Sequence, residues 1–227
     1  MKAKSTEASP RIPEALAELP HNDAIVEAAR ERGVTDVLHF THTQNLIGIL
    51  ATAVKSRALV QADSYVELVH DPNCADRWRD REWTGYVSLS ISRINDWMLG
   101  CSRRWHRNDD VEWVILSFEP EILGHPGVVF TTTNNAYPTC LRAEGMFGFG
   151  RVFADEVESY NRTITRGDLD DRYPTDRWAE ALYPGALSLD HLQRIYVDDE
   201  EMTEHIGGIL SGVARDCPTE FKPEVFR

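Results

Sequence analysis

The sequence predicts an α+β fold with a central mixed or antiparallel sheet of short strands and few helices. Several apolar segments have about four to eight residues and are rich in β-branched and aromatic residues, as strands are. Few segments show the longer spacing of apolar residues that is typical of amphipathic helices. The chain has 227 residues, is 42% hydrophobic and contains six tryptophans, which can supply a substantial core.

The expected elements follow one another along the chain. A helix is predicted over residues 22–32, with Asn22 as its cap and Gly33 after its end. A short strand over residues 37–40 leads into a second helix, for which Thr41 or Thr43 is the candidate cap. A further helix is expected over residues 95–107. The remaining expected strands are residues 85–92, 111–118, 127–133, 178–183 and 192–197.

The connections between these elements are polar. Residues 61–82 are expected to form a long connection with helical turns, and residues 142–172 a loop-rich, mobile region. Within that region, the glycine-rich residues 145–150 lack the spacing of a phosphate-binding loop and are interpreted as a flexible loop. We expect residues 1–20 to be a flexible N-terminal segment and residues 21–227 to form one domain.

Several classes of protein are disfavoured by composition. The sequence contains no long apolar run that would span a membrane and no secretory signal pattern. Its four cysteines are far apart and form no C-x-x-C pair, so neither a zinc site nor a disulfide framework is expected. Reduced cysteines and a cytoplasmic location are the resulting expectations. The sequence does not indicate an oligomeric state.

The formal net charge of -13 argues against non-specific binding to duplex DNA through a wide basic surface. Charge is nevertheless local in this chain. Two groups of basic residues are interleaved with tryptophans, a combination that suits single-strand stacking and phosphate contact but also fits a solvated helix face. The groups are Arg77, Arg79 and Arg81 with Trp78 and Trp83, and Arg103, Arg104, His106 and Arg107 with Trp97 and Trp105.

Two distant segments carry residues suited to chemistry on a dinucleotide. The first places His39, Thr41 and Asn45 at a strand-to-helix junction, where free backbone N–H groups favour a pyrophosphate. The second places Glu180 in an apolar strand after a stretch stiffened by Pro174. Taken alone, the first pattern also fits an ordinary capped helix, and the second fits an edge residue that faces solvent.

The ordered set of motifs resembles the DarT family, whose members transfer ADP-ribose to nucleobases of DNA. The resemblance covers about residues 34–197. In the family, a proline commonly follows the Leu-Ser-Ile-Ser strand, and this chain lacks it. The matching segments are His39-Phe40-Thr41-His42, Asn45-Leu46, Cys74 to Arg79, Leu89 to Ser92, Trp113-Val114-Ile115-Leu116, Thr133-Asn134-Asn135-Ala136, and Pro174-Thr175 to Ala179-Glu180.

The resemblance implies an ADP-ribosyltransferase-like fold and an NAD-dependent enzyme that modifies a nucleobase of single-stranded DNA, as a toxin or defence enzyme. It implies that Glu180 is catalytic and that His39, Thr41, Asn45 and Leu46 bind NAD. A carboxylate would stabilise the oxocarbenium-like centre formed when the nicotinamide bond breaks, or act as base toward the acceptor.

The family also uses an arginine to polarise the target base. The best match is Arg77, with Arg79 as the alternative and Arg81 nearby, so Arg77 and Arg79 are the expected acceptor-binding residues. The resemblance implies no metal, and it implies a macrodomain antitoxin as partner.

Two other functions stay open on the sequence alone. The first is ADP-ribosyl transfer to RNA, a free nucleoside or a protein, which the acidic balance favours. The second is a non-catalytic nucleotide-binding module, against which the presence of Glu180, His39 and Asn45 argues.

Overall fold

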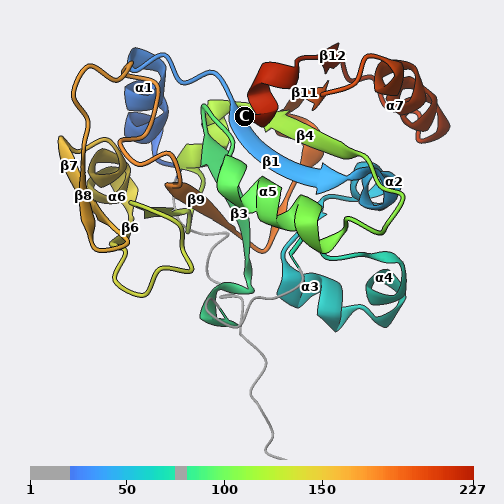
Figure 1. The fold of residues 1–227 in the computed structure, drawn as a ribbon, viewed down its shortest axis with the longest axis horizontal. Helices are drawn as coiled ribbons and strands as arrows, with labels where there is room; N and C mark the ends of the chain where they lie inside the picture. The colour runs from blue at the N-terminus through green and yellow to red at the C-terminus, as the bar shows by residue number, and fades with distance from the viewer. Residues whose placement is uncertain (1–20, 75–80) are drawn as a thin grey trace, which may run out of the picture.

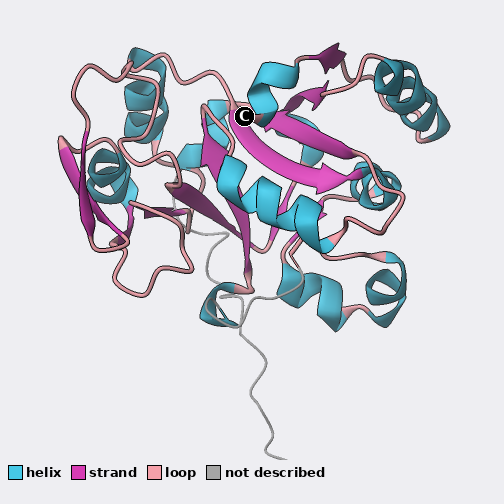
Figure 2. Ribbon diagram, in the orientation of Figure 1, coloured by secondary structure: helices cyan, strands magenta, loops and turns pink. Residues whose placement is uncertain are grey.

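An eight-stranded sheet forms the centre of the structure, a computed structural model that describes residues 21–74 and 81–227 (Figures 1 and 2). All neighbouring strands in this sheet are antiparallel except β11 and β12, which are parallel. The α+β fold with a mixed sheet of short strands is therefore confirmed. The strand order is β12 (Thr219–Phe221), β11 (Leu192–Val197), β4 (Trp113–Phe118), β1 (Val37–His42), β3 (Tyr86–Ile91), β9 (Glu180–Pro184), β5 (Val129–Thr131) and β6 (Arg142–Glu144).

Helices cover both faces of the sheet, and α5 crosses one face in front of β1 and β3 (Figure 1). Two further strand pairs lie outside the main sheet: β2 (Val54–Lys55) with β10 (Ala186–Leu187), and β7 (Glu156–Ser159) with β8 (Arg162–Thr165). The helices are α1 (Asp23–Glu31), α2 (Thr43–Ala51), α3 (Arg57–Ala62), α4 (Ser64–Val69), α5 (Asp96–Trp105), α6 (Gly145–Val152) and α7 (Glu201–Gly212). Short 3-10 helices are η2 (Arg81–Trp83), η3 (Pro120–Gly124), η4 (Leu189–His191) and η5 (Pro223–Phe226).

The buried residues form two clusters on opposite faces of the sheet. The larger cluster contains Val37, Leu116 and residues of α1, α2, α6 and α7. The smaller cluster contains Leu38, Ile115 and Leu99 of α5. Since side chains alternate along a strand, neighbouring residues of β1 and β4 enter different clusters. All six residues of β4 are buried, which explains why this strand is so apolar in sequence.

The helix α6 corrects the prediction of a flexible loop over residues 145–150. Its buried residues Phe149 and Val152 belong to the larger core cluster, and Phe149 contacts the ring of Phe130 edge to face. Gly148 lies against the backbone of Ala143, where a Cβ atom would overlap the carbonyl. Tertiary packing therefore overrides the low helix propensity of this glycine-rich stretch.

The wider region of residues 142–172 is also more ordered than predicted, because it contains β6, α6 and the β7–β8 hairpin. The prediction also assigned no element after residue 197, where the structure has α7 and β12. The expected elements over residues 22–32, 37–40, 85–92, 95–107, 111–118, 127–133, 178–183 and 192–197 are confirmed with shifted ends.

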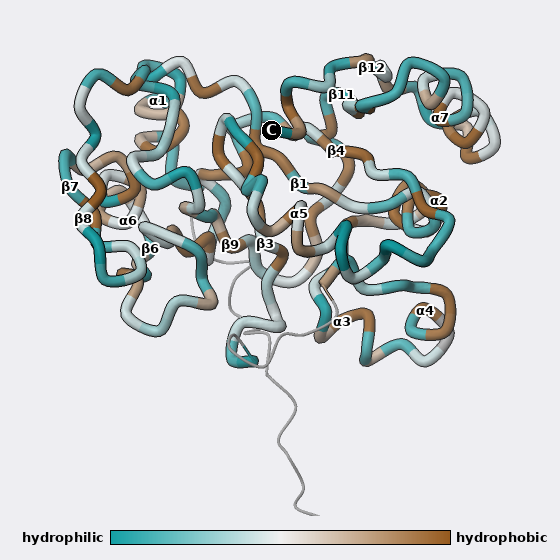
Figure 3. The backbone as a smooth tube through the Cα atoms, viewed as in Figure 1, coloured by the Kyte–Doolittle hydropathy of each residue, from teal (hydrophilic) through white to brown (hydrophobic). Residues whose placement is uncertain are grey.

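Some apolar side chains lie at the surface. Ile47 of α2 and Leu68 and Val69 of α4 are exposed, and Figure 3 shows the hydrophobic segments of both helices. Ile47 and Val69 also line a cavity of about 810 Å³. Across residues 21–74 and 81–227, no helix is both long and apolar enough to cross a membrane.

Candidate active site

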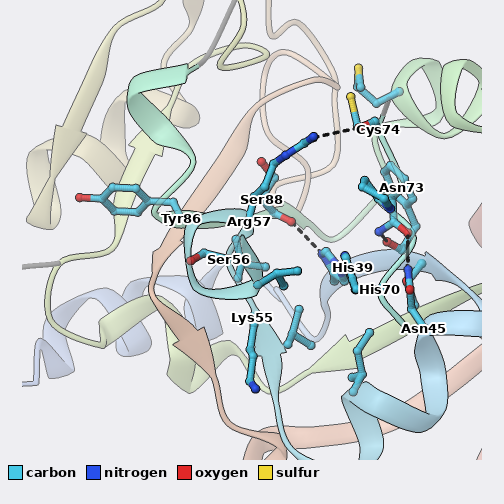
Figure 4. Close-up of a pocket in the computed structure, with 18 of the residues that line it drawn as sticks. His39, Asn45, Lys55, Ser56, Arg57, His70, Asn73, Cys74, Tyr86 and Ser88 are labelled. Atoms are coloured by element: carbon cyan, nitrogen blue, oxygen red, sulfur yellow. Dashed lines mark hydrogen bonds between the residues drawn. The ribbon is translucent and has the colours of Figure 1, made fainter. Parts of the chain in front are cut away.

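A cavity opens where β1 and β3 separate. β1 pairs with β4 along its whole length but with β3 only through Val37 and Leu38, so the second half of β1 stands apart from β3. The cavity has a volume of about 810 Å³, which suits a small-molecule cofactor. His39, Asn45 and Glu180 all line it, so the two distant segments meet at one site. Figure 4 shows part of its wall.

Glu180 is the first residue of β9 and is only 7% exposed. Its backbone pairs with Ser90 on one side and Thr131 on the other, which places it in the middle of the sheet. Its Oε2 accepts a hydrogen bond of 2.6 Å from the backbone N–H of Asn135. The carboxylate is therefore held from the strand behind it and from the neighbouring turn, as a preorganised charge should be.

A second layer of contacts orients the turn that contains Asn135. The Arg142 side chain donates from Nε to Asn135 Oδ1 at 2.7 Å and from Nη2 to the Asn135 carbonyl at 2.5 Å. The same guanidinium also donates to the carbonyl of Cys140 at 3.1 Å. Arg142 thus connects the turn to β6, and the sequence analysis did not identify this role. The adjacent polar residues at 134 and 135 were its only local signal.

His39 bridges the gap between β1 and β3. Its Nδ1 lies 3.0 Å from the carbonyl oxygen of Ser88, a contact that requires a proton on Nδ1 (Figure 4). Burial lowers the pKa of His39 to about 4, and the hydrogen bond to Ser88 opposes this shift only partly. The imidazole is therefore neutral at physiological pH, and its Nε2 is left as an acceptor.

Asn45 ties the β1–α2 junction to the loop of residues 71–73. Its Nδ2 donates to the carbonyl of Asp71 at 2.7 Å, while its Oδ1 accepts from the Asp71 backbone N–H at 3.0 Å. The Thr41 hydroxyl donates to Asn73 Oδ1 at 3.0 Å, and Asn73 Nδ2 donates to the Phe40 carbonyl at 2.9 Å. Thr41 and Asn45 are buried, and together with the half-buried Asn73 they fix this loop as one wall of the cavity.

The start of α2 differs from the prediction. Its N-cap is His42, which makes no side-chain capping bond, so neither Thr41 nor Thr43 has the predicted cap role. The backbone N–H of Thr43 donates instead to the carbonyl of Glu112 at 2.9 Å. Tertiary contacts thus replace the local cap. Leu46 is fully buried in the core and is not among the residues that line the cavity, so the structure gives it no contact with the proposed NAD site.

The predicted base-polarising arginines, Arg77 and Arg79, lie outside the described residues. The structure describes the chain up to Cys74 and again from Arg81. The carbonyl of Cys74 accepts a hydrogen bond of 3.2 Å from the Arg57 side chain (Figure 4). Cys74 itself lines the cavity.

The sequence analysis did not anticipate a cluster of two histidines and a carboxylate at the loop of residues 71–73. Ligand atoms of His42, Asp71 and His106 lie within 4.8 Å of one another. Each histidine is already hydrogen-bonded: His42 Nε2 lies 3.1 Å from the Asp71 carbonyl, and His106 Nδ1 lies 2.9 Å from Asp109 Oδ2. The cluster therefore supports the same loop that Asn45 holds. No disulfide joins any of the four cysteines, and burial raises the pKa of the Cys140 thiol to about 11.

The residues of the second tryptophan-rich basic group lie in different surroundings. Trp97 and Trp105 are exposed and line the cavity, as a surface for stacking would. Arg103, in contrast, pairs with Asp198 at 2.5 Å, and His106 is buried. Tyr160, at the tip of the β7–β8 hairpin, also lines the cavity and was missed, because nothing in its local sequence marks it.

The comparison with protein families places the chain in one of them. The sequence profile described as "ssDNA thymidine ADP-ribosyltransferase, DarT" matches residues 38–227. Among curated protein sequences, none matches the chain significantly.

Solved structures of DarT proteins share the fold. DarT of Thermus sp. 2.9 in complex with ADP-ribosylated ssDNA aligns with a TM-score of 0.59 and 15% identity over 86% of this chain and 97% of its own. The same protein in complex with NAD+ aligns with a TM-score of 0.56 and 16% identity over 85% of this chain and 98% of its own. Thermosipho africanus DarTG in complex with ADP-ribose aligns with a TM-score of 0.53 and 14% identity over 85% of this chain and 51% of its own.

Proposed function

We propose that this chain, which belongs to the DarT family of ssDNA thymidine ADP-ribosyltransferases, transfers ADP-ribose from NAD to thymidine in single-stranded DNA with Glu180 as its catalytic carboxylate. The observation that carries the assignment of residues is the position of Glu180. Its carboxylate is oriented by the Asn135 N–H at the wall of a cavity large enough for a dinucleotide. DarT structures with NAD+ and with ADP-ribosylated ssDNA share the fold and support this choice of donor and acceptor.

Glu180 would act on the bond between nicotinamide and ribose. Breaking this bond develops positive charge on the ribose carbon, and a fixed carboxylate stabilises that charge without having to reorganise. The same carboxylate can accept the proton that the attacking base loses. Its hydrogen bond to Asn135 would keep it pointed at the reacting carbon throughout.

The wall formed by His39, Thr41 and Asn45 is the NAD-binding side in this proposal. A neutral His39 suits this position, because a charged imidazole would repel the positively charged nicotinamide ring. Its Nε2 can accept a hydrogen bond from the amide or ribose of NAD. Asn45 would act mainly by holding the loop of residues 71–73 in place.

Arg77, with Arg79 as the alternative, would polarise the thymine. This assignment is supported by the family match and by the position of Cys74 at the cavity wall. A base must leave its stack to reach a buried carboxylate, which favours single strands over duplex.

The setting of the enzyme is part of the proposal. We propose that residues 21–227 work as one domain and that the enzyme acts in the cytoplasm, where NAD and cellular DNA meet. Its expected partner is a macrodomain antitoxin, consistent with the shared fold with a DarTG protein.

The proposed function is tested by incubating the protein with NAD and single-stranded oligonucleotides, followed by mass measurement. Two oligonucleotides of equal length and otherwise identical sequence are compared, one with a single thymidine and one with that thymidine replaced by cytidine. We expect addition of one ADP-ribose to the first only. Equal modification of both would contradict thymidine as the acceptor, and modification of neither would contradict the assigned activity.

A further inference from the structure

A second pocket lies beside the main cavity, and an aromatic row connects the two. The second pocket has a volume of about 340 Å³ and lies between the β7–β8 hairpin and the segment that precedes β9. Trp97 and Tyr160 line the main cavity, whereas Trp178 lines the second pocket. The ring of Trp178 lies 6.0 Å from that of Trp97 and 5.7 Å from that of Tyr160. The ring of Trp178 therefore lies next to two rings of the main cavity, one tilted and one edge-on.

The charged side chains that line the second pocket are mainly basic, together with the buried carboxylate of Asp176, although the chain carries a net charge of -13. Four arginines line it: Arg93, Arg162, Arg166 and Arg177. Arg162 is exposed and, among the residues that the structure describes, has no ion-pair partner. An exposed arginine without an ion-pair partner in the described part of the chain, beside three other arginines, suits contact with an anion.

The other arginines have different surroundings. Arg166 is tied into the loop of residues 166–175 by a bond to the Tyr173 carbonyl at 2.8 Å, so it shapes the pocket. Arg177 pairs with Asp96 at 2.7 Å and is half exposed, so a phosphate would compete with an exposed ion pair that contributes little. The Nε of Arg93 is buried without a hydrogen-bond partner in the described structure.

The hairpin tip that presents Tyr160 is strained. Tyr160 and Asn161 have φ angles of 48° and 62°, the left-handed conformation that a tight hairpin turn needs and that glycine would adopt more easily. Tyr160 stacks on Tyr137 at 4.5 Å, and the Tyr137 hydroxyl accepts from the Asn161 backbone N–H at 3.0 Å. Strain that is held in place by such contacts is typical of functional sites.

We infer that the single strand leaves the reactive centre across Trp97, Trp178 and Tyr160 and places a backbone phosphate in the arginine pocket. A nucleotide next to the target thymidine stacks on Trp97, whose side chain is 47% exposed. Arg162 contacts the phosphate, with Arg177 beside it. This inference rests on the proposed function for its choice of strand, and it adds a path and a phosphate site outside the NAD cavity. Aromatic surfaces beside basic grooves suit single strands because the bases are free to stack.

The test measures binding of a fluorescent single-stranded oligonucleotide of about 12 nucleotides to the full chain without NAD, over a range of salt concentrations. Each phosphate contact contributes about 0.7 to the slope of log affinity against log salt for a single strand. Arg162→Ala is expected to lower that slope by about 0.7. Arg30→Ala is the matched control, because Arg30 is exposed on α1 and lines neither pocket. An unchanged slope for Arg162→Ala, or an equal loss for both variants, overturns the inferred phosphate site.

The stacking surface is tested in the same assay. Trp97→Ala is expected to weaken binding at least about fivefold, which corresponds to the lower end of base-stacking energies, and Trp97→Phe is expected to restore most of it. Phe147→Ala is the control, since Phe147 is 67% exposed on α6 and lines neither pocket. Equal binding by Trp97→Ala and wild type would overturn the path.

Adding NAD to the same samples distinguishes a failure of the proposed function from a failure of the inferred DNA path. Absence of transfer with intact, Arg162-dependent DNA binding would contradict the proposed function alone. Normal transfer by the wild type, together with unaltered binding in Arg162→Ala and Trp97→Ala, would contradict this inference alone.

Discussion

The two walls of the cavity are built differently. On one wall, Glu180 presents a single carboxylate that is fixed by backbone pairing and by the N–H of Asn135. On the other wall, His39, Thr41 and Asn45 are uncharged at physiological pH, and they are joined by hydrogen bonds to the loop of residues 71–73 and to β3. One wall thus offers charge to a reacting centre, and the other offers shape and neutral polar contacts.

Under the proposed function, this difference separates chemistry from binding. A substitution at the Glu180 wall should reduce the rate of the chemical step and leave NAD affinity nearly unchanged. A substitution at the His39–Asn45 wall should act first on NAD affinity and on stability, because those side chains hold the cavity open.

The largest effect is expected for Glu180→Gln, which keeps the size of the side chain but removes its charge. The rate of ADP-ribosyl transfer should fall by about 10²- to 10⁴-fold, the usual contribution of a general acid–base group. The glutamine oxygen can still accept from Asn135, so the melting temperature and NAD affinity should change little. The transfer rate is measured from the mass of the oligonucleotide product, and the NAD affinity is measured by titration. A rate within a few-fold of wild type would contradict the catalytic role.

Arg77→Ala is expected to lower the rate of ADP-ribosyl transfer to the base at least about a hundredfold, and to leave NAD binding nearly unchanged. This loss corresponds to about 3 kcal/mol of transition-state stabilisation. Arg79→Ala is measured beside it under the same conditions. A larger loss in Arg79→Ala would move the base-polarising role to Arg79. Loss of NAD binding in Arg77→Ala would instead place Arg77 on the NAD wall.

Gly148→Ala tests whether the packing of α6 supports the Glu180 wall. The added methyl group would overlap the Ala143 carbonyl, so the free energy of unfolding should fall by about 3 kcal/mol. Gly150→Ala is the matched control in the same helix, where a Cβ atom meets nothing within 4 Å, and it should be neutral or stabilising by up to about 1 kcal/mol. Chemical denaturation of both variants measures the difference. Equal stability of the two would show that the close approach to Ala143 carries no energy.

Asn45→Ala removes both bonds to the backbone of Asp71. We expect a loss of about 2 kcal/mol in the free energy of unfolding, since buried partners are left unpaired, together with weaker NAD binding. Gln44→Ala is measured beside it, because Gln44 is an exposed amide one residue earlier in the same helix and also lines the cavity. Weaker NAD binding in Gln44→Ala alone would place the cofactor contact at the exposed side chain and contradict the role of Asn45.

The smallest effect concerns pH. Because the pKa of His39 is about 4 in the folded protein and about 6.5 when unfolded, the unfolded chain takes up its proton first as pH falls. Stability from His39 is therefore complete above pH 6.5 and is lost as pH falls toward 4. His39→Asn, which preserves a donor toward Ser88, should reduce this acid-dependent loss by about 1 kcal/mol, after allowance for solvent screening. His125, whose pKa burial also lowers to about 4, should retain its own share in both proteins. Identical pH profiles for wild type and variant would contradict the assigned ionisation.

Much of the fold follows from local patterns. β3 was predictable because its apolar residues alternate with serines, and β1 and β4 because they are short apolar runs. α6 was not, because three glycines argue against a helix and the packing of Phe149 on Phe130 comes from a distant strand. α7 was missed although its apolar residues recur at helical spacing, because the adjacent Gly207 and Gly208 argue against a helix.

The site was predictable only in part for the same reason. The motif match could indicate Glu180, His39 and Asn45, since these residue types follow from the chemistry. Their partners could not be predicted: Asp71 lies 26 positions from Asn45, and the hydrogen bond from Asn135 to Glu180 spans 45 positions. Such contacts depend on which strands become neighbours, and no local pattern encodes that.

The most direct test of the account compares acceptors for wild type and Glu180→Gln under one salt condition. Single-stranded DNA, duplex DNA, RNA and free thymidine are each incubated with NAD, and the products are identified by mass. We predict that wild type adds ADP-ribose to thymidine of single-stranded DNA and that Glu180→Gln does not. Modification of RNA or the free nucleoside alone would contradict the assigned acceptor, and equal modification by both proteins would contradict the catalytic carboxylate.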